Sequence, residues 1–161
     1  MSAPSPRWDV FCAVVDNYGD AGVAWRLARQ LAAEHAIAVR LFVDDTRALA
    51  RIAPEIDAAT SEQCVRGVDV RAWGGAKAHL GAGPGDVVVE AFGCGLAAEY
   101  LAAMAARGRP PVWINLEYLS AESWIEDCHG LASRHATLPL TRYFFFPGFT
   151  AKSGGLLREH D

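Results

Sequence analysis

The sequence predicts an α/β fold with a doubly wound, mostly parallel sheet. Apolar segments rich in Val, Ile and Phe, typical of strands buried on both faces, alternate along the chain with segments of helical periodicity. The chain has 161 residues, of which 52% are hydrophobic and 21% charged, so it can bury a sizeable core. We therefore expect one domain over residues 8–161, preceded by a loose leader over residues 1–7.

The first half of the chain contains three of the predicted strands. Its predicted elements are a strand over 8–15, a helix over 21–35, a strand from Val39, a short helix over 46–57 and a more polar strand from Cys64. In the first helix, Val23, Leu27 and Leu31 fall on one apolar stripe. Pro54 has no amide hydrogen, so we expect the second helix to stop near it.

The second half repeats this alternation as far as Gly130 and then loses it. A glycine-rich region over 74–86 leads to a strand over 86–92, a helix over 95–108, a strand over 112–116 and a helix that starts at Ser120. Beyond Gly130, prolines, glycines and aromatic residues dominate. There we expect a loop-rich segment with little sheet, in which the final GGLLRE begins to look helical.

Charge and cysteine content argue against several classes of protein. The formal net charge is −4, whereas domains that bind nucleic-acid phosphates are usually basic. The four cysteines are far apart and form no C-x-x-C, which indicates a reduced, cytoplasmic protein without a metal site. The apolar run near the start ends at Asp16, so it predicts neither a signal peptide nor a membrane segment.

Three segments at strand exits carry the candidate site. In open α/β sheets, ligands bind beyond the carboxyl ends of the strands, so these segments should share one edge. They are DNYGDAG over 16–22, FGCG over 92–95 and NLEYLS over 115–120. Besides two aspartates, the residues that we expect to contact substrate are Tyr18, Gly19, Phe92, Asn115 and Glu117.

The segment DNYGDAG places two aspartates, Asp16 and Asp20, four residues apart. One interpretation is structural: Asp20 caps the following helix, and Asp16 closes the strand as a turn residue. The other is chemical: two carboxylates face a polar or cationic substrate, and Gly19 lets the backbone approach it. The sequence leaves both interpretations open, and they can coexist.

The segment FGCGLAA supports a second functional hypothesis. It has the pattern G-x-G-x-x-A after a strand, a variant of the dinucleotide fingerprint, and Glu117 follows about twenty residues later. An oxidoreductase domain that binds a dinucleotide is therefore the alternative. The fingerprint normally occupies the first βαβ unit, however, so we favour glycines that allow close packing of strand and helix.

Longer runs of the sequence resemble one family. They are DNYGDAGVAWRLARQLA, VVVEAFGCG, INLEYLSAESWIEDCHGL and LPLTRYFFFPGFTAKSGGLLRE. These runs cover most of the chain except roughly residues 35–85. Together they resemble the amino-terminal half of the EarP family, the protein-arginine rhamnosyltransferases that modify bacterial elongation factor P.

The resemblance implies the Rossmann-like, acceptor-binding half of a GT-B glycosyltransferase. It implies inverting transfer of L-rhamnose from dTDP-β-L-rhamnose to an arginine of elongation factor P, with no metal and no cofactor. On the shared motif, Asp20 matches the catalytic general base and Asp16 its supporting, orienting partner. The carboxy-terminal domain that binds the nucleotide sugar is absent from this chain, so we expect the chain alone to be inactive.

Overall fold

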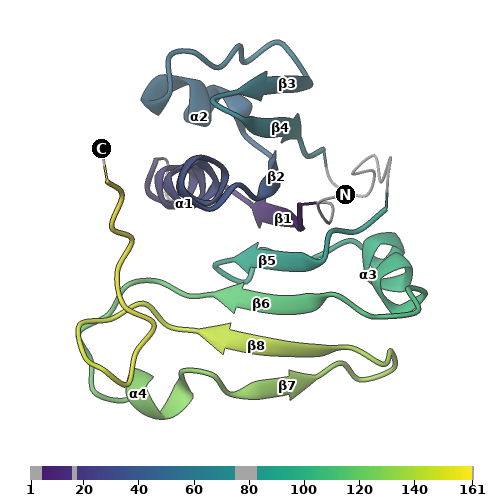
Figure 1. The fold of residues 1–161 in the computed structure, drawn as a ribbon, viewed down its shortest axis with the longest axis vertical. Helices are drawn as coiled ribbons and strands as arrows, with labels where there is room; N and C mark the ends of the chain where they lie inside the picture. Colours follow the sequence, from purple (N-terminus) through teal and green to yellow (C-terminus); the bar gives the residue numbers. More distant parts are fainter. Residues whose placement is uncertain (1–4, 16–17, 75–82, 161) are drawn as a thin grey trace.

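The computed structural model describes residues 5–15, 18–74 and 83–160, which form one sheet with helices on both faces (Figure 1). The strands are β1 (Arg7–Cys12), β2 (Ala38–Val43), β3 (Glu62–Val65), β4 (Val68–Ala72), β5 (Val87–Ala91), β6 (Val112–Leu116), β7 (Ala132–Arg134) and β8 (Thr141–Phe145). The helices are α1 (Gly19–His35), α2 (Thr46–Ile52), α3 (Ala98–Ala105) and α4 (Ile125–Cys128).

The sheet has the order β3-β4-β2-β1-β5-β6-β8-β7. Its two edge strands, β3 and β7, pair antiparallel with their neighbours, and every other described pairing is parallel. From β1 the chain winds first toward β2 and β4 and then, in the other direction, toward β5, β6 and β8. The order therefore reverses between β1 and β5, the kind of place where α/β sheets bind ligands.

The two faces of the sheet have separate cores, which confirms the doubly wound α/β prediction. Val10 and Cys12 of β1 belong to the cluster that includes α1, whereas Phe11 packs with Tyr100 and Met104 of α3. Successive side chains of a strand point to opposite faces. Helices α1 and α3 thus cover opposite faces of the sheet.

Helix α1 was predicted, but of the three residues placed on its apolar stripe only Leu31 belongs to the face that it buries. Its buried apolar residues are Ala21, Ala24, Trp25, Ala28 and Leu31, most of them three or four residues apart. Val23 and Leu27, which were placed on the buried stripe, are only partly buried. The sheet contacts the alanine-rich side because small side chains let the helix come close. Val23 and Leu27 lie at the margin of this core, where they line a cavity.

The predicted single strand from Cys64 is wrong, because β3 and β4 form an antiparallel hairpin. The turn lies at Arg66 and Gly67, whose φ angles are 50° and 79°. Two successive residues with positive φ are typical of a two-residue hairpin turn. The alternation of side chains, which suggested one strand, did not indicate this turn. Most of the predicted glycine-rich region follows this hairpin, and its residues 75–82 lie outside the described part of the chain.

The expectation of little sheet after Gly130 is also wrong. Strand β8, which contains most of the aromatic run, pairs in parallel with β6, and β7 pairs with β8. Ser120 does not start a helix: its Oγ accepts a hydrogen bond from the Glu122 N–H, and α4 begins only at Ile125. The GGLLRE segment is not helical but runs beside α1, where Glu159 bonds to Arg26.

Candidate active site

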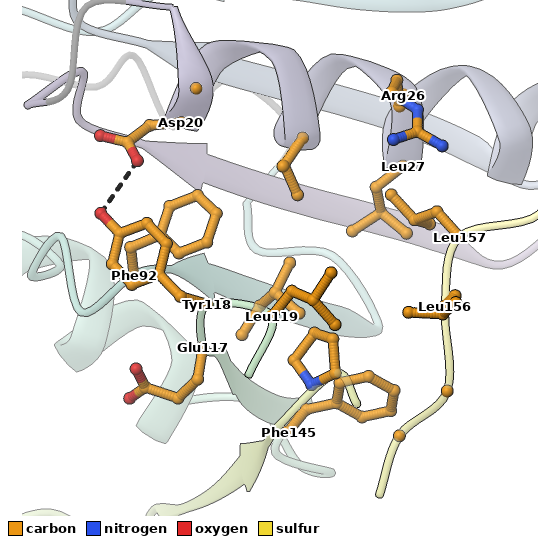
Figure 2. A pocket seen from close by; sticks show the side chains of 16 residues that line it. Asp20, Arg26, Leu27, Phe92, Glu117, Tyr118, Leu119, Phe145, Leu156 and Leu157 are labelled. Atoms are coloured by element: carbon orange, nitrogen blue, oxygen red, sulfur yellow. Dashed lines mark hydrogen bonds between the residues drawn. The ribbon is translucent and has the colours of Figure 1, made fainter. Parts of the chain in front are cut away.

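The predicted strand exits meet at a cavity of about 540 Å³ on the α1 face of the sheet. Figure 1 shows β5, β6 and β8 ending on the same side of the sheet, where the C-terminal segment passes them. The cavity has one wall on α1, a floor at these strand exits and another wall on the C-terminal segment (Figure 2). Most of its lining is apolar, and the polar side chains are Asp20, Arg26, Glu117 and Tyr118.

Asp20 is a buried carboxylate with defined partners. Its side chain lies in the first turn of α1, and the residue is 1% exposed. One oxygen, Oδ2, accepts the Val15 N–H at 2.9 Å, and Oδ1 accepts the Tyr118 hydroxyl at 2.9 Å. The N-cap of α1 is Tyr18, so the prediction that Asp20 caps the helix is wrong. The first helical turn still favours a negative charge at this position.

Tyr118 was not singled out from the sequence, although it lies in the strand-exit segment NLEYLS. Its ring stacks on Phe92, with centroids 4.2 Å apart and planes 14° apart. Figure 2 shows the two rings side by side, with the Tyr118 hydroxyl directed at Asp20. Phe92 has a φ of 57°, so the backbone bends sharply after β5 to present this ring. The stack fixes the position of the hydroxyl that binds Asp20.

Glu117 and Asn115 form a second polar pair at the exit of β6. Asn115 is 1% exposed, and its Nδ2 donates to Glu117 Oε1 at 2.5 Å. Its Oδ1 accepts no hydrogen bond from the described residues. Glu117 lines the cavity, whereas Asn115 reaches it only through Glu117. Figure 2 shows the Glu117 carboxylate separated from Asp20 by the Phe92 and Tyr118 rings.

Two further predicted residues, Tyr18 and Gly19, lie at the start of α1. Gly19 lines the cavity next to Asp20. Tyr18 is exposed and its hydroxyl accepts a hydrogen bond from Arg51 at 2.7 Å, away from the cavity lining. Asp16 lies outside the described residues, so its predicted role beside Asp20 stays a prediction.

The two glycines of FGCGLAA allow an unusual backbone conformation; they are not needed for close packing of strand and helix. Gly93 and Gly95 have φ angles of 61° and 78°, and a Cβ on Gly95 would meet nothing within 4 Å. The Gly95 N–H donates to Glu90 Oε1 at 2.8 Å, and α3 begins only at Ala98. The close-packing interpretation is therefore wrong. The amide that a dinucleotide phosphate would need is already bonded to a carboxylate of the protein.

The described residues offer no thiolate nucleophile in the core and no metal cluster. All four cysteines are free, and burial raises the pKa of Cys12 and of Cys94 to about 12. These two side chains therefore stay protonated thiols. Within the described ranges, no three His, Cys, Asp or Glu side chains are grouped to hold a metal ion. No described helix has the length and apolar character needed to cross a membrane.

Comparison with known proteins points to one family. A family model described as Elongation-Factor P (EF-P) rhamnosyltransferase EarP matches residues 8–161. The chain is 60% identical over 152 residues to the protein-arginine rhamnosyltransferase of Pseudomonas aeruginosa, covering 94% of the chain and 40% of that protein. It is 59% identical over 152 residues to the Pseudomonas putida protein of the same name, with the same coverage.

A more distant relative gives the same result. The chain is 44% identical over 167 residues to the protein-arginine rhamnosyltransferase of Shewanella oneidensis, covering 99% of the chain and 41% of that protein. The chain thus spans about two fifths of the length of the curated relatives that it matches.

Proposed function

The chain belongs to the family of elongation factor P (EF-P) rhamnosyltransferases, and from that premise we propose that it is the acceptor-side domain of such an enzyme. The proposed reaction is inverting transfer of L-rhamnose from dTDP-β-L-rhamnose to an arginine of elongation factor P. The observation that carries the proposal is the buried Asp20 carboxylate at the edge of the cavity. Free cysteines support the reducing, cytoplasmic location that we propose for the enzyme.

Arginine chemistry explains why such a site needs a carboxylate. A guanidinium stays protonated at physiological pH and its lone pairs are delocalised, so it is a poor nucleophile. A carboxylate orients the guanidinium through its fork and stabilises its positive charge. It can also accept the proton that the attacking nitrogen loses as the bond to the sugar forms.

In the proposed step, an arginine nitrogen attacks the anomeric carbon of rhamnose. The new N–C bond forms as the bond between that carbon and the diphosphate oxygen breaks, and dTDP leaves with the electron pair. The nitrogen gives up one proton, which we assign to Asp20 as general base. Asp16 is assigned the supporting, orienting role that the family motif implies.

The contacts of Asp20 suggest how the acceptor reaches it. Two of its hydrogen bonds are described: Oδ2 accepts the Val15 N–H, and Oδ1 accepts the Tyr118 hydroxyl. The residue is buried, with Tyr118 covering Oδ1. We therefore expect an arginine N–H to replace the Tyr118 hydroxyl at Oδ1, while the Val15 N–H keeps Oδ2 in place.

The cavity also suits a cationic loop of the acceptor protein. Glu117 adds a second carboxylate to the lining, and the chain has a formal net charge of −4. Opposite charges on two surfaces favour encounter and fix orientation. The donor would bind across a cleft on the second domain, where basic residues or a helix N-terminus would neutralise the diphosphate without a metal.

Mass spectrometry of elongation factor P tests the proposal. The purified acceptor is incubated with dTDP-β-L-rhamnose and either the whole enzyme or this chain alone. We expect one deoxyhexose on one arginine with the whole enzyme, and no added sugar with the chain alone, because the donor must be held opposite the acceptor. An unmodified acceptor after incubation with the whole enzyme would contradict the proposed reaction.

A thermal-shift measurement separates the proposal from the dinucleotide alternative. Because the Gly95 N–H is bonded to Glu90, we expect NAD and NADP to leave the melting temperature unchanged. Saturable stabilisation by either dinucleotide would favour the oxidoreductase hypothesis.

A further inference from the structure

A second cavity, of about 350 Å³, lies on the opposite face of the sheet from Asp20. Its floor is formed by Glu90 of β5 and Trp113 of β6, which belong to the α3 face. One wall carries Leu96 and Leu101, and the other is the β7–β8 hairpin with Arg142. The site is therefore separate from the proposed acceptor cavity, and nothing in the proposed transfer uses it.

Arg142 is held in one orientation at this cavity. Its Nη1 donates to Glu90 Oε2 at 3.2 Å. Its guanidinium carbon lies 5.3 Å from the Trp113 ring centroid and 5.2 Å from that of Phe144. Glu90 is itself fixed, because it is 2% exposed and also accepts hydrogen bonds from the Trp113 indole and the Gly95 N–H. A cation anchored in this way loses little freedom on binding a ligand.

The arrangement leaves one edge of the Arg142 guanidinium, formed by Nε and Nη2, open. Among the described residues, Arg142 Nε and Nη2 have no hydrogen-bond partner, and the side chain is 29% exposed. These two donors form the edge that binds a carboxylate or a phosphate through two parallel hydrogen bonds. A purely structural role, neutralising Glu90, needs only Nη1. The exposed fork is therefore left for a ligand.

The rest of the lining also favours an anion. Arg134 adds a second positive charge, and Glu90 is the only carboxylate among the described lining residues. The Nδ1 atom of His135 accepts the N–H groups of Thr137 and Leu138, so the neutral ring carries its hydrogen on Nε2 and can donate. The volume falls in the range of small-molecule sites.

We propose that this cavity binds a small organic anion, with a carboxylate or phosphate monoester on the Arg142 fork. A flat apolar body would lie against Trp113, Leu96 and Leu101, which supply the apolar part of the lining. The two charged groups share the same hydrogen-bonding chemistry, and ligands that carry one or the other distinguish between them.

Protein NMR on the whole enzyme tests the site with four probes. Phenyl phosphate and benzoate carry the proposed anion on an aromatic ring, benzyl alcohol lacks the charge, and inorganic phosphate lacks the ring. We expect saturable shifts of the Trp113 indole N–H with at least one aromatic anion, and binding at least about tenfold weaker for benzyl alcohol and for inorganic phosphate. Absence of a saturable shift with both aromatic anions, or equal binding of benzyl alcohol, would overturn the proposal.

Substitutions at Arg142 separate the fork from charge alone. Arg142→Gln should weaken the aromatic anion at least about tenfold, and Arg142→Lys should also weaken it because a lysine cannot bind bidentately. Arg109→Gln is the matched control, since Arg109 is exposed and lies outside the cavity lining. If Arg142→Gln does not fold, Arg142→Lys, which keeps the charge beside Glu90, tests whether the anion is bound by the guanidinium fork. Unchanged binding in Arg142→Lys would contradict recognition by the fork.

Discussion

At the scale of single residues, the central feature is a carboxylate that is buried and yet placed at a cavity. Burying a charge is costly unless hydrogen bonds compensate for it. Asp20 has compensation from the Val15 N–H, the Tyr118 hydroxyl and the first turn of α1. The same contacts hold its oxygens in a fixed position, as the proposed role of general base requires.

Asp20→Asn separates the chemical role from the structural one. The asparagine oxygen can accept the Val15 N–H, and its amide can donate to the Tyr118 oxygen, so both described contacts have replacements. We expect a stability loss of about 1 kcal/mol or less from the lost charge at the helix N-terminus. Because an amide cannot accept the proton, rhamnose transfer by the whole enzyme should fall at least about a hundredfold.

The two readouts for this variant are the rate of sugar transfer and the thermal melt. Tyr118→Phe is the companion variant, since it removes the hydroxyl and keeps the ring on Phe92. It should lower activity less than Asp20→Asn does, because Asp20 keeps its charge. Full activity of Asp20→Asn would leave its carboxylate with a structural role only.

Sequence reasoning located the cavity on the α1 face to within a few residues. The rule about carboxyl ends of strands identified the segments with Gly19, Asp20, Phe92 and Glu117, all of which line the cavity. It missed Tyr118, because the rule selects a segment and not the direction of each side chain. It also named Asn115, which does not line the cavity, because strand alternation turns that side chain to the other face from Ile114 and Leu116.

At the scale of elements, the C-terminal segment is attached to α1 by ionic contacts. The His160 N–H and the Gln30 amide lower the pKa of Glu34 to about 2, and the Arg26 guanidinium lowers the pKa of Glu159 to about 2. The two carboxylate side chains are 15% and 22% exposed, but their partners His160 and Arg26 are largely exposed to solvent, so the contribution of these pairs to stability is small. Each carboxyl lies at a contact between α1 and the C-terminal segment, so its pKa reports whether the segment is docked.

The pH dependence of this docking follows from the lowered pKa values. A carboxyl with a depressed pKa stabilises the docked form fully above its unperturbed pKa of about 4.3, and this stabilisation is lost as the pH falls toward the lowered value. We expect the contribution of these two carboxyls to docking to be constant from pH 7 to about pH 5 and to weaken between about pH 4 and 2.

Carboxyl carbon NMR shifts of Glu34 and Glu159 measure this directly. Midpoints near 2 are expected for both carboxyls. Arg26→Gln is the control, and it should raise the midpoint of Glu159 while leaving the Glu34 contacts in place. Midpoints at the ordinary value for glutamate would mean that the segment is not docked in solution.

Gly154 shows how closely the same segment packs on the sheet. A Cβ there would overlap the Phe145 ring of β8. Gly154→Ala should therefore lower the free energy of unfolding by about 1–3 kcal/mol, since the segment or the ring must move. Gly108→Ala is the control, because a Cβ there meets nothing within 4 Å and its φ is not positive.

Denaturant unfolding of the two glycine variants gives the comparison. Gly108→Ala should be neutral or stabilising by up to about 1 kcal/mol. Equal stability of the two variants would show that the segment does not pack on Phe145.

The elements that the sequence failed to predict depend on distant partners. Strands β5 and β6 were predicted closely because each is a mostly apolar run, interrupted only by Glu90 or Asn115, and is largely buried within the sheet. Strand β8 is only half buried, and its strand character comes from pairing with β6. Local periodicity cannot report such a pairing, nor the positive φ angles that divide β3 from β4.

At the scale of the whole molecule, the sheet separates two cavities. The proposed acceptor cavity lies on the α1 face, near the reversal of strand order between β1 and β5, and the proposed anion cavity lies on the α3 face. The alternation of strands and helices made this layout predictable in outline. The cavity on the α3 face was not predictable, because its wall is the β7–β8 hairpin that the sequence pattern did not reveal.

The most direct test of the proposed acceptor-side role is a titration of isotope-labelled chain with elongation factor P, followed by NMR. We expect shifts of residues around the acceptor cavity, above all Phe92, Glu117 and Tyr118, and weaker binding at higher salt because the contact is between opposite charges. Residues around Arg142 on the opposite face should not shift. No change in the spectrum, or shifts confined to the α3 face, would contradict the assignment of this chain as the acceptor-side domain.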